Sequence, residues 1–283
     1  MTNDTSTGTT TLADDLRRRA GVARDEAHVV LGHVRTVGTR RYFTLREKVV
    51  GPGDNPDLAS GPLPAYGETI DVDGITMRID ERMSEFNIRK LMTGRHTRHE
   101  RSLVVDRLRD DDVVMELGGG IGMVAIACAQ RIGSERVVSY EANPELEALI
   151  RDNYELNDVS PTLRMMMLGA EEGTRTFHLA ERFSHSSAQL GGDGTRPVEV
   201  PVGAVDQHLA EVSPTVLVVD IQGGEVEFFD EADLSGVRLL LVELHPFIIG
   251  LSGVRSVRGA LRSAGFEVVE RSGQSYLFAR PTV

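Results

Sequence analysis

The feature that most constrains this sequence is a set of short apolar segments that each end in an acid. Three of them span residues 113–116, 136–141 and 215–220. Helical patterns fill the intervals, at about 122–132 and 144–156. Strands that alternate with helices favour a mainly parallel sheet with helices on both faces. We therefore predict a doubly wound α/β fold.

A glycine-rich turn follows the first segment, with Gly118, Gly120 and Gly122 at alternate positions. Glycines let the backbone approach a ligand at the carboxyl end of the sheet, where open α/β folds bind cofactors. A dinucleotide fingerprint needs its third glycine where Met123 stands, whereas G-x-G-x-G is typical of methyltransferases. We expect these glycines to bind the cofactor. Glu116 would either order the turn or, through water, hold the cofactor's ammonium group.

The second segment ends in Glu141, 25 residues after Glu116. A carboxylate at this strand end can accept hydrogen bonds from both ribose hydroxyls of a cofactor. We expect Glu141 and the glycine turn to converge on the same adenosyl group. The same acid would also accept hydrogen bonds from the ribose of NAD, so an NAD-dependent oxidoreductase stays open as an alternative.

Candidate catalytic residues follow the later strands. Asp220 ends the third segment, and we expect it to face the cofactor cleft. Glu225 opens the next helix, where it either complements the helix dipole or belongs to the site. His245 follows a strand and has a pKa range suited to a base, the alternative being a hydrogen-bonded structural histidine. Asp220, Glu225 and Glu243 could instead hold Mg²⁺, but their spacing is not diagnostic and we expect no metal.

Charge and composition restrict the partners. The net charge of −12 makes nucleic acid an unexpected substrate, because phosphate binding depends on clustered Lys and Arg. No apolar run reaches the roughly 18 residues that a membrane span needs, and the first residues lack a secretory signal pattern. The single cysteine, Cys128, excludes an internal disulfide and fits a reducing compartment. We expect a cytoplasmic protein that acts on a small molecule, without nucleic acid or membrane partners.

The N-terminal part differs in composition from the rest. Residues 1–13 have too little apolar surface for burial to offset the conformational entropy lost on folding, which predicts a disordered tail. Residues 14–66 combine a helical pattern with a linker rich in Gly and Pro, and this extension could serve as a dimer arm. A β-hairpin predicted at 68–79 then begins a catalytic domain that we place at 67–283.

Five motifs in this order resemble the FkbM family of class I methyltransferases. They are MELGGGIG at 115–122, YEANP at 140–144, LGAEEG at 168–173, VDIQGGE at 219–225 and VELHP at 242–246. The resemblance covers roughly three quarters of the chain, from about Glu68 to the end. Within it, Gln222 stands where the family has Glu, which removes a charge at a position where a base or metal ligand would be suspected. A non-catalytic methyltransferase-like binding module is therefore a second alternative.

The resemblance implies a seven-stranded, mainly parallel, Rossmann-like sheet with S-adenosyl-L-methionine as the cofactor. It also implies an O-methyltransferase whose acceptor is a hydroxyl of a sugar, polyketide or other secondary metabolite. The residues that the family motifs add to the expected cofactor-binding set are Glu100, Ala142, Asn143, Gly169, Ala170 and Asp220.

Overall fold

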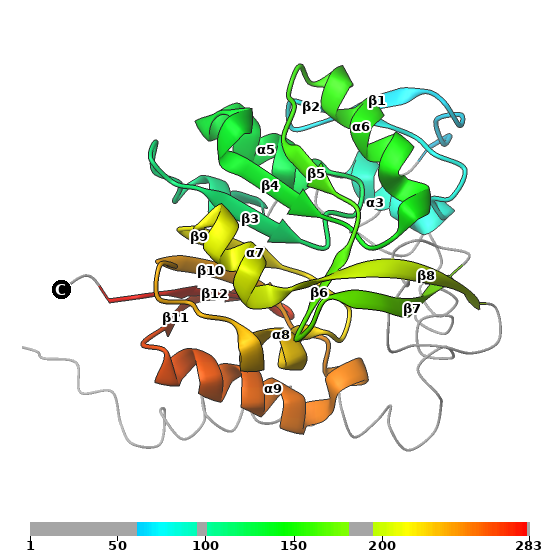
Figure 1. Cartoon of the computed structure of the whole chain (residues 1–283). Helices are drawn as coiled ribbons and strands as arrows, with labels where there is room; N and C mark the ends of the chain where they lie inside the picture. The colour runs from blue at the N-terminus through cyan, green and yellow to red at the C-terminus, as the bar shows by residue number, and fades with distance from the viewer. Residues whose placement is uncertain (1–60, 95–100, 181–194, 282–283) are drawn as a thin grey trace, which may run out of the picture. The chain divides into compact units, whose positions relative to one another are not determined.

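The computed structural model describes residues 61–94, 101–180 and 195–281, all within a compact unit of Val50–Val283 (Figure 1). The predicted tail and the predicted extension up to residue 60 lie outside the described residues, as does Glu100. Among the helices that the structure describes, none is long and apolar enough to cross a membrane.

A seven-stranded sheet forms the centre, in the order β11-β12-β10-β9-β3-β4-β5 (Figure 1). Its strands are β3 (Val114–Leu117), β4 (Val137–Tyr140), β5 (Thr162–Arg164), β9 (Val216–Val219), β10 (Leu239–Glu243), β11 (Glu267–Ser272) and β12 (Ser275–Ala279). The first five pair in parallel, and β12 lies antiparallel to both β10 and β11. This arrangement confirms the predicted doubly wound, mainly parallel fold of class I methyltransferases.

Helices cover both faces of this sheet (Figure 1). They are α5 (Met123–Ile132) and α6 (Glu147–Leu156) on one face, and α7 (Val205–Val212), α8 (Glu225–Glu231) and α9 (Pro246–Ser263) on the other. Successive strand residues alternate between the two cores, since Val216 and Val218 pack in the first and Leu217 and Val219 in the second. A strand that is buried on both faces needs an unbroken apolar run, which explains why these segments contain no polar alternation.

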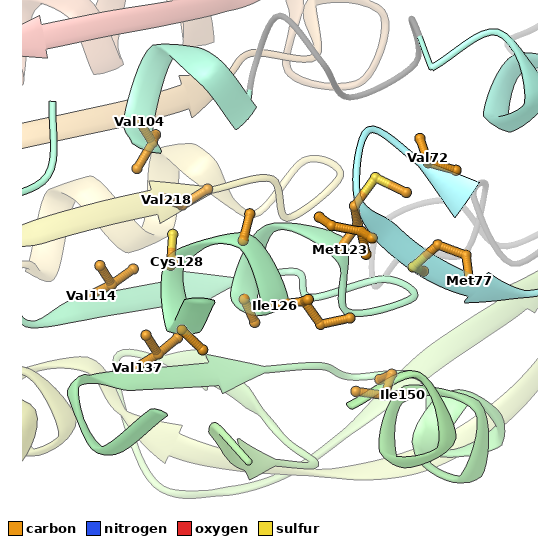
Figure 2. Packing of buried hydrophobic residues seen from close by; sticks show 14 of the residues in the cluster. Val72, Met77, Val104, Val114, Met123, Ile126, Cys128, Val137, Ile150 and Val218 are labelled. Atoms are coloured by element: carbon orange, nitrogen blue, oxygen red, sulfur yellow. The ribbon is translucent and has the colours of Figure 1, made fainter. Parts of the chain in front are cut away.

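Figure 2 shows the first of the two cores. Ile126 and Cys128 of α5 lie among Val114, Val137 and Val218 of the central strands, all at most 6% exposed. The cysteine therefore fills the core, as its apolar neighbours in the sequence predict.

The predicted hairpin is present as β1 (Thr69–Val72) and β2 (Ile75–Arg78), followed by α3 (Glu85–Met92). Asn153 of α6 and Asn157, which caps the end of that helix, hold β2 against the first face of the sheet. Asn157 Oδ1 accepts from the Thr76 backbone N–H at 2.8 Å, and Asn153 Oδ1 accepts from the Arg78 N–H at 2.9 Å. The edge of β2 is thus satisfied by side chains instead of by another strand.

The largely apolar residues 163–168 predict one short strand, but the structure divides them between two sheets. β5 belongs to the central sheet, whereas β6 (Met167–Gly169) begins a separate sheet with β7 (Gly173–Ala180) and β8 (Thr195–Ala204), in the order β6-β8-β7. The Met166 N–H donates to the Arg164 carbonyl at 3.1 Å, a tight turn that redirects the chain. Because no Gly or Pro marks this turn, and Arg164 is the one polar residue beside it, the sequence pattern did not reveal it.

Helix boundaries also differ in two places from the sequence pattern. The sequence predicts a helix at about 255–264, but α9 begins directly after His245 and contains a non-helical Gly250. The helix expected from Pro144 begins as a 3₁₀ turn, Pro144–Leu146, before α6. Both differences lie at the carboxyl edge of the sheet, where they set the chain direction beside the candidate site.

Candidate active site

The carboxyl ends of β3, β4 and β9 meet around Gly118. Its N–H donates to the Tyr140 carbonyl at 2.9 Å, and the Asp220 N–H donates to the Leu117 carbonyl at 2.9 Å. A Cβ at Gly118 would lie only 1.8 Å from the Asp220 carbonyl oxygen, and its φ is +86°. Only glycine fits between the two neighbouring strand ends in this conformation.

Glu141 connects the end of β4 to the glycine turn. Its Oε2 accepts from the Gly120 N–H and its Oε1 from the Asn143 N–H, both at 2.7 Å. Burial raises the pKa of Glu141 to about 7, although these two N–H groups oppose the shift. Since a carboxylate oxygen can accept more than one hydrogen bond, both oxygens retain capacity for hydroxyl donors.

The turn is open at Gly120, whose N–H donates to Glu141. A Cβ placed at Gly120, whose φ is +56°, would meet nothing within 4 Å. The glycine turn and Glu141 therefore lie in contact, and the free space at Gly120 fits a ligand that approaches the backbone closely. That both bind the same adenosyl group stays a prediction. Asn143, 3% exposed, supports this edge by accepting from the Glu145 N–H at 3.0 Å.

Glu116 lies beneath the turn. The carboxylate is 2% exposed and accepts a short hydrogen bond from Ser139 Oγ on the neighbouring strand. Burial raises the pKa of Glu116 to about 7, and the Ser139 hydrogen bond opposes the shift. A Cβ at Gly119 would lie 3.4 Å from Glu116 Oε2. Of the two expected roles, this position favours ordering the turn. Ser139 was not anticipated, because its pairing with Glu116 depends on the strand register.

Four other expected cofactor-binding residues lie in different surroundings. Gly122 begins α5 against Tyr154, whose Cε1 would be 2.9 Å from a Cβ at that position. Gly169 ends β6, and the Ala170 N–H donates to Glu227 of α8 at 3.4 Å. Ala142 packs against the small core of β7 and β8. A cofactor role for these four residues stays a prediction.

His245 and Glu225 form a buried pair. His245 Nδ1 lies 2.6 Å from Glu225 Oε1, with side chains 8% and 0% exposed. The other ring nitrogen, Nε2, lies 2.9 Å from Gln222 Nε2 and 3.5 Å from Asp220 Oδ1. The three residues proposed from the sequence as catalytic, Asp220, Glu225 and His245, are thus brought together by the ends of β9 and β10 and the start of α8.

The charges around His245 determine its protonation. Burial by itself lowers the pKa of the imidazole, but the Glu225 hydrogen bond and the charges of Asp220 and Glu243 outweigh it and raise the pKa to about 9. Burial also raises the pKa of Asp220, and the charge of His245 opposes that shift. The Asp220 and Glu243 side chains are 41% and 29% exposed, so the cluster is accessible from their side.

One donor atom each from Asp220, Glu243 and His245 lies within 4.8 Å of the others, close enough to share a cation. Gln222 Nε2, however, lies 3.1 Å from Asp220 Oδ1 as well as 2.9 Å from His245 Nε2. The amide NH₂ of Gln222 thus already contacts two of these three groups, and we assign no metal here. The expectation of a site without metal stays a prediction. Gln222 was noticed in the sequence only as a departure from the FkbM motif.

Comparison with known proteins identifies the chemistry at the cofactor end. The family model of the TRM5/TYW2 methyltransferase domain matches residues 74–182, which include the glycine turn and Glu141. No curated protein matches the chain.

Solved structures with a similar fold include methyltransferases of several kinds. A ribosomal protein L11 methylase from Lactobacillus delbrueckii subsp. bulgaricus is 15% identical, with 72% of this chain and 83% of that chain covered and a TM-score of 0.42. A Pyrococcus abyssi tRNA (uracil-54, C5)-methyltransferase in complex with S-adenosyl-L-homocysteine is 12% identical, with 76% of this chain and 44% of that chain covered and a TM-score of 0.41. A precorrin-6y C5,15-methyltransferase from Geobacter metallireducens GS-15 is 16% identical, with 77% of this chain and 97% of that chain covered and a TM-score of 0.40.

The expectation that nucleic acid is not a partner is contradicted by the family match, because TRM5/TYW2 domains are tRNA methyltransferase domains. The expectation failed because it used the net charge of the whole chain, which does not describe the potential of a local surface.

The match and the geometry agree on the cofactor end. A methyltransferase model covers the turn that the strand ends assemble, and Glu141 and Gly120 border an open space at that turn. Neither alternative reading, an NAD-dependent oxidoreductase or a non-catalytic module, is needed. The chain is an S-adenosylmethionine-dependent methyltransferase, and S-adenosyl-L-methionine is its cofactor.

Proposed function

We propose that this methyltransferase acts on a hydroxyl oxygen and that His245 removes the proton of the acceptor. The observation that carries the proposal is the buried contact of 2.6 Å between His245 Nδ1 and Glu225 Oε1. A hydroxyl must lose its proton during or after attack, and a histidine held by a carboxylate at one nitrogen offers the other as a base when the ring is neutral. Because the pKa of His245 is raised to about 9, the neutral form increases as the pH rises toward that value. The accessible Asp220 would orient the acceptor beside that nitrogen.

At the other end of the site, Glu141 would accept from the ribose hydroxyls and the Gly118–Gly120 backbone would approach the amino acid part of the cofactor. Bound S-adenosylmethionine supplies an electrophilic methyl group on its sulfonium. The contribution of the chain is positioning: it holds the acceptor oxygen in line with that methyl group while His245 takes the proton.

The single cysteine supports an oxygen acceptor over chemistry that needs a thiolate nucleophile. Cys128 is fully buried in the first core, and burial raises the pKa of its thiol. A thiol in that position is neither ionised nor accessible to a substrate.

Two acceptor classes remain to be compared. The FkbM resemblance, which includes the motifs around Asp220 and His245, favours a hydroxyl on a sugar, polyketide or other secondary metabolite in the cytoplasm. The TRM5/TYW2 match favours nucleic acid as a second candidate, but it ends at residue 182, before Asp220, Glu225 and His245. The matched part therefore concerns cofactor binding more than the choice of acceptor.

The test is methyl transfer from labelled cofactor to a panel of sugars, polyketides and tRNA, with the methylated atom of any product identified by NMR. We expect an O-methyl product. His245→Asn should lower kcat by about 100-fold or more with unchanged cofactor affinity. Glu231→Gln, an exposed acid at the end of α8, is the matched control and should keep full activity. An N- or C-methyl product, or full kcat in the His245 variant, would refute the proposal.

A further inference from the structure

The side chain of Gln222 bridges the two groups that face the acceptor side of the cluster. Its Nε2 lies 2.9 Å from His245 Nε2 and 3.1 Å from Asp220 Oδ1. An amide NH₂ carries two protons, so it can donate one to each of these atoms. On the far side of the ring, Nδ1 lies 2.6 Å from Glu225 Oε1, which as a carboxylate accepts the Nδ1 proton.

When His245 is neutral, which its raised pKa of about 9 favours only above that pH, these three contacts specify one tautomer of the ring. Nδ1 carries the proton that Glu225 accepts, and Nε2 is the unprotonated acceptor of the Gln222 N–H. Turning the amide over would place its carbonyl oxygen against the Asp220 carboxylate, and two acceptors at 3.1 Å repel each other. The observed orientation is the one that satisfies both neighbours of the amide.

The backbone at this point is tied to the same acid that holds the histidine. Gln222 has a φ of +48°, rare for a residue with a side chain, and Gly223 follows at +108°. The Gly223 N–H donates to Glu225 Oε1 at 3.1 Å, the oxygen that also contacts His245 Nδ1. The loop therefore fixes the amide relative to the imidazole, since one carboxylate anchors both.

We propose that Gln222 is a positioning residue that holds the neutral form of His245 in the tautomer with Nε2 as an acceptor, until the acceptor hydroxyl replaces the amide. This inference rests on the proposed role of His245 as the base. The charged or titratable groups that face the ring are Glu225 from α8, Asp220 from the end of β9 and Glu243 from β10. A fourth carboxylate in place of Gln222 would favour the imidazolium, which has no free lone pair to act as a base.

The tautomer is measured by NMR on the full chain with ¹⁵N-labelled histidine, where His245→Asn identifies the signals. In the wild-type protein we expect a neutral His245 with the proton on Nδ1 above the midpoint of its titration. In Gln222→Glu this midpoint should rise by about one pH unit or more, because a carboxylate replaces an N–H donor. Gln222→Met removes the donor without adding a charge and should give a smaller rise. Gln207→Glu adds the same charge at an exposed position of α7 and should change nothing.

An unchanged His245 midpoint in Gln222→Glu, or a wild-type proton on Nε2, would overturn the proposal. Addition of MgCl₂ or ZnCl₂ should leave the ¹⁵N chemical shift of His245 Nε2 unchanged. A change in that chemical shift on adding metal would indicate a cation site in place of the role proposed for the amide. None of these measurements needs a methyl acceptor. If His245 is not the base, His245→Asn keeps its kcat while the titrations remain as expected, so failure of the proposed function and failure of this inference are distinguishable.

Discussion

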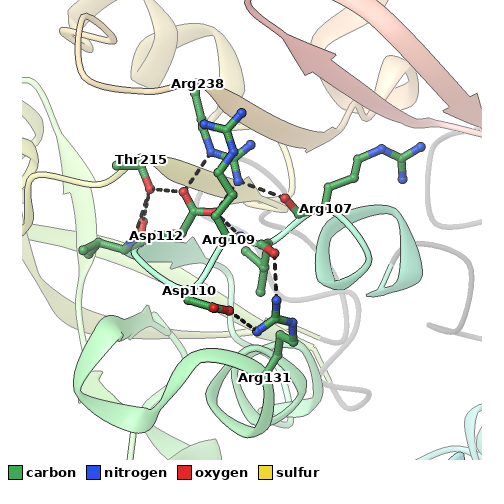
Figure 3. A network of polar contacts seen from close by, with 9 residues as sticks. Arg107, Arg109, Asp110, Asp112, Arg131, Thr215 and Arg238 are labelled. Carbon is green, nitrogen blue, oxygen red and sulfur yellow. Dashed lines mark hydrogen bonds and ion pairs between the residues drawn. The ribbon is translucent and has the colours of Figure 1, made fainter.

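Buried acids at the two ends of the central sheet have different kinds of hydrogen-bond partner. At the amino ends of the strands, Asp112 is 2% exposed and receives hydrogen bonds from Arg238 Nε at 2.8 Å, Thr215 Oγ1 at 2.7 Å and the Arg109 N–H at 2.7 Å (Figure 3). One carboxylate thereby joins the segments that lead into β3, β9 and β10. At the carboxyl ends, Glu141 accepts from two backbone N–H groups and Glu116 from a serine hydroxyl.

The difference in partners decides the direction of the pKa shift. Burial alone would raise the pKa of all three acids. For Asp112 the hydrogen bonds from Arg238, Arg109 and Thr215 outweigh burial, so its pKa is lowered. For Glu116 and Glu141 burial prevails, and the pKa rises to about 7. A buried acid paired with a guanidinium stabilises the fold. A buried acid that accepts only from neutral donors can still accept hydrogen bonds from a ligand.

The largest effect expected from this comparison is on folding. Asp112→Ala leaves the Arg238 guanidinium without its partner and should lower the free energy of unfolding by about 3 kcal/mol. Urea denaturation of the full chain measures this value. Asp110→Ala is the control, because the exposed ion pair of Asp110 with Arg131 should contribute less than about 1 kcal/mol. Equal losses in the two variants would contradict the structural role of Asp112.

The second effect is on cofactor affinity. Glu141→Gln replaces a charged acceptor of the ribose hydroxyls with a neutral amide and should weaken binding of S-adenosylhomocysteine by about tenfold or more. Its free energy of unfolding should fall by about 1–3 kcal/mol, because glutamine offers one acceptor oxygen to the two backbone N–H groups of Gly120 and Asn143. Calorimetric titration and urea denaturation measure the two quantities, with Glu155→Gln on the exposed side of α6 as the control. A variant that loses stability but keeps its affinity would reverse the assignment of Glu141.

The smallest effect is on pH dependence. Because the pKa of Glu141 in the folded protein is raised to about 7, its contribution to stability is fully present below its ordinary value of 4.5 and is lost as the pH rises through 7. Ribose hydroxyls bind best to the ionised form, so cofactor binding near pH 6 should release a fraction of one proton, and affinity should rise from pH 5.5 to 8. Calorimetry in buffers of different ionisation enthalpy detects this proton. Binding without proton release at pH 6 would show that Glu141 is already ionised.

Much of the fold was predictable because burial on both faces of a parallel strand leaves an unbroken apolar run. The central strands followed from such runs, the hairpin from its alternation of apolar and polar residues, and the contact of Glu141 with the glycine turn from the acids and glycines that end the strands. The division between β5 and β6 did not, since no Gly or Pro marks the turn at Met166.

Contacts that depend on register or side-chain rotation were beyond the sequence. Ser139 meets Glu116 only because β4 pairs with β3 in that register. Asp220 and His245 could be placed at neighbouring strand ends, but the amide of Gln222 between them follows from a left-handed backbone that the sequence pattern does not require. The error about nucleic acid arose differently, because a net charge averages over a surface that a substrate meets only locally.

The most direct test of the central claim is a crystal structure of the chain with S-adenosylhomocysteine. We expect the ribose on Glu141, the homocysteine backbone along Gly118–Gly120, and the sulfur directed toward the side where Asp220 and His245 lie. A ligand bound elsewhere, with Glu141 still occupied only by its two backbone N–H groups, would contradict the account.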